Sequence, residues 1–438
     1  MASPLPLTGR VAFAGALIAP VCTFALWLRR PELLIGGYIF ALPLLDRREL
    51  VSGLEPAELA TAVVVAVGAL AVVTRRRARI PARFQLIFWT LVALAIVGAM
   101  AGLANDVLDR EQVATSVFKP LSWVVVLYLV LLYFDSPRKL RGLLLAMILS
   151  GAAVAMIAVV QLAAGNVPVS GDDVPRARGT FENYNDLGGF MALMAVPALT
   201  YALSTRRGSL KVLLLAAFVV QLAALLLSGT LGSLLGLLVA GVLSLRIWKV
   251  RPAAGLAMVA LALVAAAALA LLAPAQASRV HLLGNRAEDR LGTYAAGIKI
   301  AKDHVWLGTG SVENAVDLLR QNSEYHSTRF GLVDSEPHNI FLEQLVVSGV
   351  AGLALLVFLV WFAVRALLAS MPRPAADDYI LRWGLVLGAT AFLVQNLTNN
   401  LLSHARLGVL FLVFVAIAAR FRELDAESLP EEGEYVLR

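Results

Sequence analysis

The sequence predicts an all-α polytopic membrane protein with about twelve membrane-spanning helices and one large helical loop outside the bilayer. Of its 438 residues, 59% are hydrophobic and only 15% are charged, and the mean hydropathy is +0.79. Apolar stretches recur along the chain with short polar loops between them. One longer polar stretch, from Pro274 to Pro337, interrupts this pattern. A single soluble core is incompatible with such a composition.

The apolar stretches define thirteen candidate spans: 11–28, 32–45, 57–74, 84–104, 117–134, 140–164, 187–203, 210–227, 230–248, 253–273, 339–365, 380–400 and 406–420. Several are shorter than the roughly 20 residues that a hydrocarbon core requires. Arg29, Arg30 and Pro31 separate the first two stretches, so we interpret these two as one broken or re-entrant pair. No cleavable signal peptide is expected, because arginines rather than a cleavage site follow the first stretch.

The basic residues predict the orientation of these spans. They cluster in every second loop: Arg75 to Arg77 with Arg79; Arg138, Lys139 and Arg141; Arg206, Arg207 and Lys211; Arg246, Lys249 and Arg251; Arg365 and Arg373. The positive-inside rule places these loops in the cytoplasm and the alternating loops outside. The long loop holds seven Lys or Arg against eight Asp or Glu, which is typical of a translocated segment. We therefore expect the chemistry of the long loop to face the periplasm or cell exterior.

These expectations divide the chain into four parts. They are an N-terminal bundle at 1–274 with an outward loop at 165–186, a periplasmic loop at 275–338, C-terminal helices at 339–420 and a cytoplasmic tail at 421–438. The net charge of +7 lies largely in short loops, so membrane lipids are expected partners and nucleic acid is not. The single cysteine, Cys22, excludes an intrachain disulfide.

Apolar residues at helical spacing predict an amphipathic helix over roughly 287–304 in the long loop, and a second short helix near 312–320. Arg286 and Arg290 lie four residues apart near the start of the first helix, so they share one face and are able to grip a diphosphate. The alternative is that they pair with Glu288, Asp289 or lipid headgroups.

The earlier outward loop carries two more arginines, Arg176 and Arg178, just before an Asn/Asp-rich helix start. We expect Asn185 or Asp186 to be the N-cap of that helix. Arg178 stands beside a glycine with no adjacent acid, which favours an anionic ligand as its partner.

His338 follows a proline where the long loop returns to apolar sequence, and it is the predicted catalytic base. Asn339 or Glu336 is expected to orient the imidazole or the acceptor, or else to cap the helix that begins there. The remaining histidines, His281, His304, His326 and His404, are interpreted as structural. Gly349 and Gly352, three residues apart, are interpreted as helix-packing positions. No HExxH, DxD or phosphate-loop motif occurs, so we expect neither a metal nor a cofactor.

The order of these motifs resembles that of the bacterial O-antigen ligase and O-antigen polymerase superfamily. The resemblance rests on Arg178-Gly179-Thr180-Phe181 with Asn183 and Asn185, on Arg286 and Arg290 leading to Gly308-Thr309-Gly310, and on His338-Asn339 followed by Gly349-Val350-Ala351-Gly352. It implies an architecture similar to that of GT-C glycosyltransferases, with about a dozen helices. It also implies a donor glycan carried on undecaprenyl pyrophosphate and an acceptor that is lipid A-core or a growing glycan.

The sequence thus favours an O-antigen ligase that transfers a glycan to a sugar hydroxyl of lipid A-core, with inversion and without a metal. His338 would be the base, and Arg178, Arg286, Arg290 and Arg176 would hold the diphosphate. A polymerase of the same superfamily is the first alternative. A transporter or flippase of lipid-linked glycans is the second, although few charges lie within the spans and no internal repeat is evident.

Overall fold

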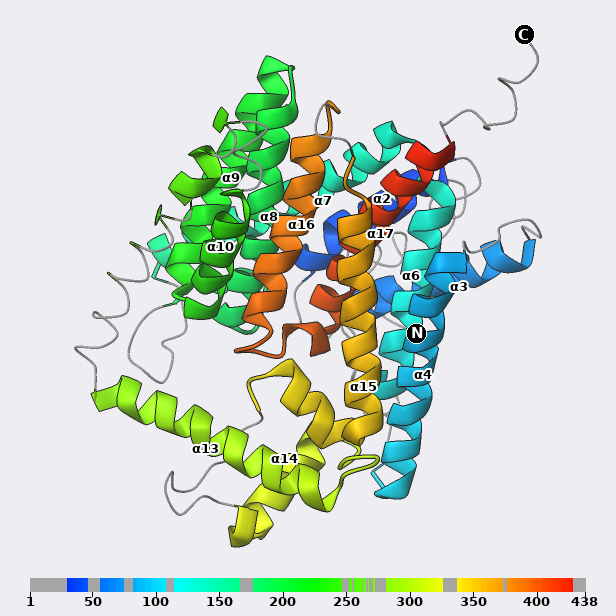
Figure 1. The fold of residues 1–438 in the computed structure, drawn as a ribbon, viewed down its shortest axis with the longest axis vertical. Coiled ribbons are helices and arrows are strands. Elements are labelled where there is room, and N and C mark those ends of the chain that lie inside the picture. Colours follow the sequence, from blue (N-terminus) through cyan, green and yellow to red (C-terminus); the bar gives the residue numbers. More distant parts are fainter. Residues whose placement is uncertain are drawn as a thin grey trace, which may run out of the picture.

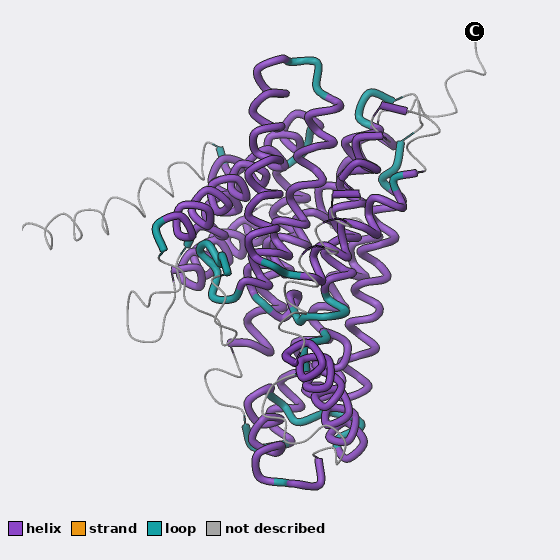
Figure 2. The backbone as a smooth tube through the Cα atoms, turned by 90° about the vertical axis from the view of Figure 1, so that its left-hand side faces the viewer, coloured by secondary structure: helices purple, strands orange, loops and turns teal. Residues whose placement is uncertain are grey.

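The computed structural model describes residues 30–45, 56–74, 82–107, 114–165, 176–245, 281–325, 337–372 and 376–427, with short pieces of 252–271. Within these ranges the regular structure is helical, without a strand (Figure 2). The long helices stand side by side as a bundle, and α13 (His281–Asp303) and α14 (Val312–Gln321) lie across one end of it (Figure 1).

The bundle is built from α2 (Pro31–Ala41), α3 (Pro56–Thr74), α4 (Ala82–Ala104), α6 (Lys119–Tyr133), α7 (Pro137–Ala163), α8 (Tyr184–Ser204), α9 (Gly208–Ser228), α10 (Leu231–Leu243), α15 (Ile340–Ala369), α16 (Tyr379–Gln395) and α17 (Ala405–Glu427). Short turns η1 (Leu42–Leu44), η3 (Ser323–Tyr325) and η4 (Leu401–Ser403) and a π-helical segment, η2 (Ala114–Phe118), connect them. Each bundle helix coincides with an apolar stretch of the sequence.

The predicted membrane spans are confirmed in part. Six helices are long and apolar enough to cross a bilayer: the helical segment 116–133, α4, α7, α8, α9 and α15. Three shorter apolar helices cover Pro31–Leu44, α10 and α16. The first candidate span, 11–28, lies outside the described residues, and 253–273 is described only in pieces. The expected total of about twelve therefore stays a prediction.

Helix α8 occupies the middle of the bundle. In the apolar, membrane-spanning part of α8, 83% is buried inside the protein, whereas in the corresponding part of the neighbouring α9 only 28% is buried. Apolar side chains that point outward, such as Val212 and Val219 on α9, suit a helix that faces lipid. The segment at the start of α8 is therefore anchored in the most enclosed part of the protein.

The connecting segments fall into two groups at opposite ends of the bundle. At one end, the 205–207 turn meets the 376–378 turn, where Arg206 contacts Asp377 at 3.4 Å. At the other end, the segment before α8 contacts the turn between α9 and α10, and the segment before α15 contacts the loop after α16. This separation agrees with the alternation of basic and non-basic loops in the sequence.

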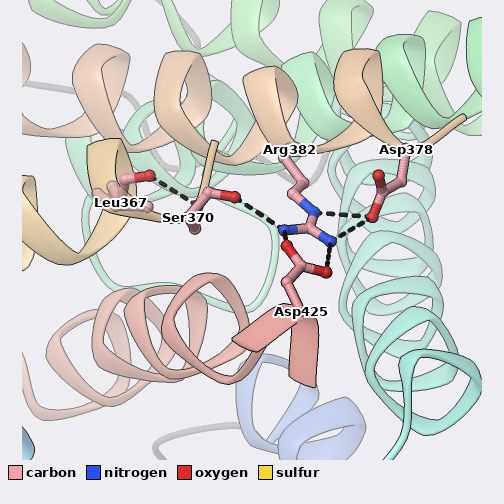
Figure 3. A network of polar contacts seen from close by, with 5 residues as sticks. All are labelled: Leu367, Ser370, Asp378, Arg382 and Asp425. Carbon is pink, nitrogen blue, oxygen red and sulfur yellow. Dashed lines mark hydrogen bonds and ion pairs between the residues drawn. The ribbon is translucent and has the colours of Figure 1, made fainter. Parts of the chain in front are cut away.

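Arg382 fastens the first of these ends (Figure 3). Its side chain is 3% exposed, and its guanidinium donates to Asp378 on its own helix, to Asp425 on α17 and to the carbonyl of Ser370 after α15. It also lies over the ring of Phe421, 4.7 Å from the centroid. One buried cation thereby joins the ends of α15, α16 and α17.

We expect Arg382→Ala to lower the thermal unfolding temperature of the detergent-purified protein. Removal of one member of a buried ion pair leaves its partners unsatisfied, and because Asp425 is half exposed the loss is about 2–3 kcal/mol. The control is Arg206→Ala, whose ion pair has side chains that are 91% and 86% exposed and should change nothing measurable. Equal decreases of the unfolding temperature in the two variants would contradict the role of Arg382 in joining α15, α16 and α17.

Candidate functional site

Helix α15, which begins just after His338, is broken at Gly349. This residue has φ 63° and ψ −164°, outside the helical region, and the short segment 340–348 meets the long segment 350–369 there at an angle (Figure 1). A positive φ is the conformation that glycine adopts without a steric penalty. Gly349 was expected to lie within a helix as a packing residue: the close packing is observed, but the helix is interrupted at this residue.

The backbone groups that this break frees are satisfied by the turn after α13. The amides of Thr309 and Gly310 donate to the carbonyls of Val346 and Val347, at 2.8 and 2.9 Å. In return, the amide of Val350 donates to the carbonyl of Val305, also at 2.8 Å. An unpaired backbone group close to lipid costs several kcal/mol, so this exchange stabilises the break.

The close approach of the two segments explains the glycines of the motif. A Cβ atom at Gly308 would overlap the backbone of Val346 and Val347, and one at Gly349 would overlap the carbonyl of Trp306. Gly308 also has a positive φ, 68°. These residues hold the α13–α14 layer against the bundle and so fix the direction in which the short segment of α15 points.

His338 lies directly before this short segment and is half buried. The next residue, Asn339, is the N-cap of α15: its Oδ1 accepts from the amides of Phe341 and Leu342 at 3.0 and 3.1 Å. Its Nδ2 donates to the carbonyl of Leu397, while the amide of Ile340 donates to that of Asn396. The capping role expected for Asn339 is observed, and the cap ties the His338 segment to the loop after α16.

Helix α13 lies next to His338. The hydroxyl of Tyr294 donates to the carbonyl of His338 at 3.3 Å. Arg290, one turn earlier on the same face, is exposed. The backbone of Arg286 is helical, but its side chain lies outside the described residues, as does Glu336. The two expected arginines therefore share the helix that contacts His338, and only Arg290 has a described side chain.

Arg176 is held at the same end of the protein. Its Nε and Nη2 donate to the carbonyls of Ser228 and Gly229, each at 2.8 Å, and its guanidinium carbon lies 3.3 Å from the ring centroid of Tyr184. Burial lowers the pKa of Arg176 and the charge of Arg290 lowers it further, whereas Tyr184 raises it, with a net decrease. The charge of Arg290 thus acts on Arg176, which agrees with the position of both residues at the same end of the bundle.

Arg178 differs from Arg176 in its surroundings. Its side chain is exposed, whereas Ala177 between the two arginines is buried and donates its amide to the carbonyl of Leu227. The backbone around Arg178 is thus fixed while its guanidinium remains accessible. A ligand anion can reach Arg178 without breaking an internal contact of Arg176.

The start of α8 differs from the expectation. Its N-cap is Asn183, whose Oδ1 accepts from the amide of Asn185 at 2.8 Å, so the prediction of Asn185 or Asp186 as the cap was wrong. Asn185 lies in the first turn, and its carbonyl accepts from Gln395 on α16 at 2.9 Å. Sequence spacing cannot separate three polar residues within four positions, because any of them is a favourable cap.

Asp186, freed from the capping role, pairs with a histidine that sequence reasoning treated as structural. Its Oδ2 lies 2.8 Å from Nδ1 of His404, and the two side chains are 7% and 27% exposed. The other carboxylate oxygen, Oδ1, is buried and has no hydrogen-bond partner among the described residues. The residues are 218 positions apart, so no local pattern could have revealed the pair.

The charge on His404 follows from its neighbours. Burial lowers its pKa, but the hydrogen bond and charge of Asp186 and the charge of Glu343 raise it, Lys119 opposes them, and the net pKa is raised above its ordinary value. Glu343, 5% exposed, accepts hydrogen bonds from Asn400 and Ser403. Asp186 and Glu343 therefore favour the imidazolium form of His404, which lies at the same end of the bundle as His338.

This arrangement can serve transfer between two polar substrates. One half-buried histidine directly precedes the capped start of α15, and arginines from α13 and from the segment before α8 lie at the same end of the bundle to meet negative charge. Among the described residues, no group of three or more His, Cys, Asp or Glu side chains is arranged to hold a metal ion.

We expect Gly349→Ala to lower the unfolding temperature markedly. An alanine would be strained at this positive φ, by about 1–3 kcal/mol, and would also collide with the Trp306 carbonyl. Gly142→Ala is the matched control, because a Cβ at this helical position meets nothing within 4 Å. We call the exchange of backbone hydrogen bonds between the 305–310 turn and the break at Gly349 the interlock. Thermal unfolding of both variants in the same detergent provides the measurement, and an unchanged unfolding temperature of Gly349→Ala would contradict the role of the interlock.

Comparison with known proteins adds a family to this geometry. Residues 216–357 match a family model described as O-antigen ligase. A search of curated proteins found no match. The matched residues include α13, the 305–310 turn, His338 and the break at Gly349, which carry the interlock described above. In this part the chain is similar to the O-antigen ligase family, which supports the resemblance to the O-antigen ligase and O-antigen polymerase superfamily.

Proposed function

We propose that the protein is a membrane glycosyltransferase that moves a glycan from undecaprenyl pyrophosphate to a sugar hydroxyl of lipid A-core, as an O-antigen ligase. The family match supports the general class, a membrane glycosyltransferase-like enzyme that acts on lipid-linked glycans. The donor, the acceptor and the inverting, metal-independent course are our proposal. The reaction would take place at the periplasmic face of the inner membrane.

The observation that carries the proposal is the position of α13 between the two halves of the site. Through Tyr294 the helix contacts His338, and through Arg290 it approaches Arg176 on the earlier loop. A base and a cationic surface that neighbour one helix are what transfer from a lipid diphosphate requires. A purely structural role for the arginines gives no reason for them to approach one another, since like charges repel.

In the proposed step, His338 removes the proton from the acceptor hydroxyl as its oxygen attacks the anomeric carbon of the donor sugar. The bond from that carbon to the diphosphate oxygen breaks, and undecaprenyl pyrophosphate leaves with the bonding electrons. Attack opposite the leaving group inverts the anomeric centre. Outside the cytoplasm no nucleotide sugar is present, so the activation must come from the lipid diphosphate itself.

The arginines are proposed to neutralise charge that develops on the leaving diphosphate. Arg178 and Arg290 are exposed and fit direct contact, and Arg286, four residues before Arg290 in the sequence, is proposed to join them. Arg176 donates to two carbonyls and so supports the segment before α8. It is proposed to add positive charge near the diphosphate without direct contact. Asn339, and Glu336 beside His338, would orient the base, and Asn185 would support the start of α8.

Two alternatives use the same site. A polymerase would add the donor glycan to another lipid-linked glycan, and the family match includes both classes. A transporter would move the lipid-linked glycan without transfer. The GT-C-like architecture, with about twelve spans, remains part of the proposal rather than of the observed fold.

We expect His338→Ala to reduce transfer by about 10²- to 10⁴-fold without loss of folding. Purified protein would be incubated with undecaprenyl pyrophosphate-linked glycan and lipid A-core in the presence of a chelator, and the products sized. A ligase gives lipid A-core with added glycan, and a polymerase gives longer lipid-linked chains. Full activity of the variant would exclude His338 as the base, and dependence on metal would exclude the arginine-based mechanism.

We expect Arg178→Ala to weaken donor binding and Arg176→Ala to lower the stability of the fold. Loss of Arg178 removes a charged contact to the donor, so its KM should rise about 10- to 100-fold while the unfolding temperature stays constant. Loss of Arg176 leaves two carbonyls without their donor, so the unfolding temperature should fall. Steady-state kinetics with varied donor, together with thermal unfolding, separates the two, and identical behaviour would contradict the assignment.

A further inference from the structure

We call the segment that carries Arg176 and Arg178 the arginine wall of the candidate site, and the 396–404 loop its second wall. The contact of Asp186 with His404 joins these two walls. Asp186 is in the first turn of α8, directly after the loop that carries Arg176 and Arg178. His404 directly precedes α17, at the end of the 396–404 loop. The 2.8 Å contact between them connects the arginine wall to this loop.

The 396–404 loop is in turn bound to the His338 segment. The carbonyls of Asn396 and Leu397 accept from the Ile340 amide and the Asn339 side chain. Farther along, Asn400 and Ser403 donate to Glu343, one turn into α15. A continuous set of hydrogen bonds therefore runs from the segment after His338, through the loop, to His404 and on to Asp186.

We propose that His404, through its contact with Asp186, is a positioning residue that holds the anion-binding loop of Arg176 and Arg178 in register with His338. This inference rests on the proposed function for its kinetic consequence, although the coupling itself does not require catalysis. A displacement of about 1 Å between a base and the groups that bind the leaving group is enough to slow a transfer reaction about 100-fold. The pair thus controls alignment rather than chemistry.

The buried position of the pair makes it effective. Asp186 is 5% exposed, so its attraction to a cation is poorly screened by water. A neutral imidazole would still donate one hydrogen bond but would leave the carboxylate charge without an opposite charge at Oδ2. Because Oδ1 has no hydrogen-bond partner among the described residues, the contact at Oδ2 with His404 is the side-chain contact on which the placement of this carboxylate depends.

The charged groups around His404 determine the sign of its pH dependence. Asp186 on α8 and Glu343 on α15 favour the imidazolium, while Lys119 at the start of α6 opposes it; Arg406 lies on the first turn of α17. Because the folded-state pKa is raised, the pair contributes fully below the ordinary histidine pKa. Its contribution is lost as pH rises through the raised value. Alignment should therefore fail on the alkaline side.

The kinetic test compares pH profiles of kcat/KM for the wild type, His404→Gln and Asp186→Asn. We expect His404→Gln to lower kcat/KM about 10-fold at neutral pH and to abolish the alkaline decline. Asp186→Asn should move that decline about one to three pH units lower. His304→Gln is the matched control, and its profile should equal that of the wild type. A wild-type alkaline limb in His404→Gln would overturn the proposal.

A second test needs no substrate. In a Cys22→Ser background, spin labels at Glu182→Cys, before α8, and Leu397→Cys, half exposed on the 396–404 loop, report the distance between the two walls. One narrow distribution is expected at pH 6, a broader one at alkaline pH, and a broad one at both pH values with His404→Gln. Identical narrow distributions in both proteins would overturn the coupling.

The two tests separate the inference from the proposed function. If no transfer is detected with any acceptor but the distances respond to pH and to His404→Gln, the coupling stands and the glycosyltransferase proposal fails. If transfer is detected and neither the distances nor the pH profile depend on His404, the proposed function stands and His404 is not a positioning residue.

Discussion

The arrangement of the whole site depends on the exchange of backbone hydrogen bonds between the 305–310 turn and the break at Gly349. A helix that changes direction beside a bilayer frees carbonyls and amides that lipid cannot satisfy. Here the carbonyls of Val346 and Val347 and the amide of Val350 all find partners in the turn after α13. The same bonds that make the break tolerable also attach α13 to the bundle. The position of Arg290 relative to His338 is therefore a consequence of how the backbone is satisfied.

Two kinds of contact arrange the site, and we expect them to differ in their sensitivity to pH. The interlock at Gly349 uses backbone groups, so pH has no direct effect on it. The link between Asp186 and His404 uses titratable side chains, and its response to pH is our proposal. Rigid backbone contacts thus fix the coarse position of α13 and α15, and a titratable contact adjusts the fit between α8 and the 396–404 loop. Such a division places the adjustable element between the two walls, where small shifts have the largest effect on alignment.

The sequence predicted the helices well because hydropathy is a local property. The bounds of α4, α7, α8 and α9 lie within a few residues of the apolar stretches. The glycines of the motif were visible too, but their role was not: a glycine pair three residues apart is consistent with packing, and only the backbone angles of Gly349 reveal a break. The pairing of Asp186 with His404 could not be predicted, because it depends on the tertiary arrangement of α8 and α17. The choice of Asn183 as the N-cap of α8 depends on its extended backbone conformation, which the amino-acid composition does not encode.

The arginines at the two ends of the bundle differ in how far the fold engages their donors. At one end, the guanidinium of Arg382 donates to two carboxylates and a carbonyl and lies on an aromatic ring, so that its bonding capacity is consumed by the fold. At the other end, Arg178 is exposed and Asp186 retains a carboxylate oxygen without a partner in the described part of the chain. The donors of Arg382 are thus engaged within the fold, whereas those of Arg178 can meet an anionic ligand. This difference supports the proposal that substrates bind at the end that carries His338.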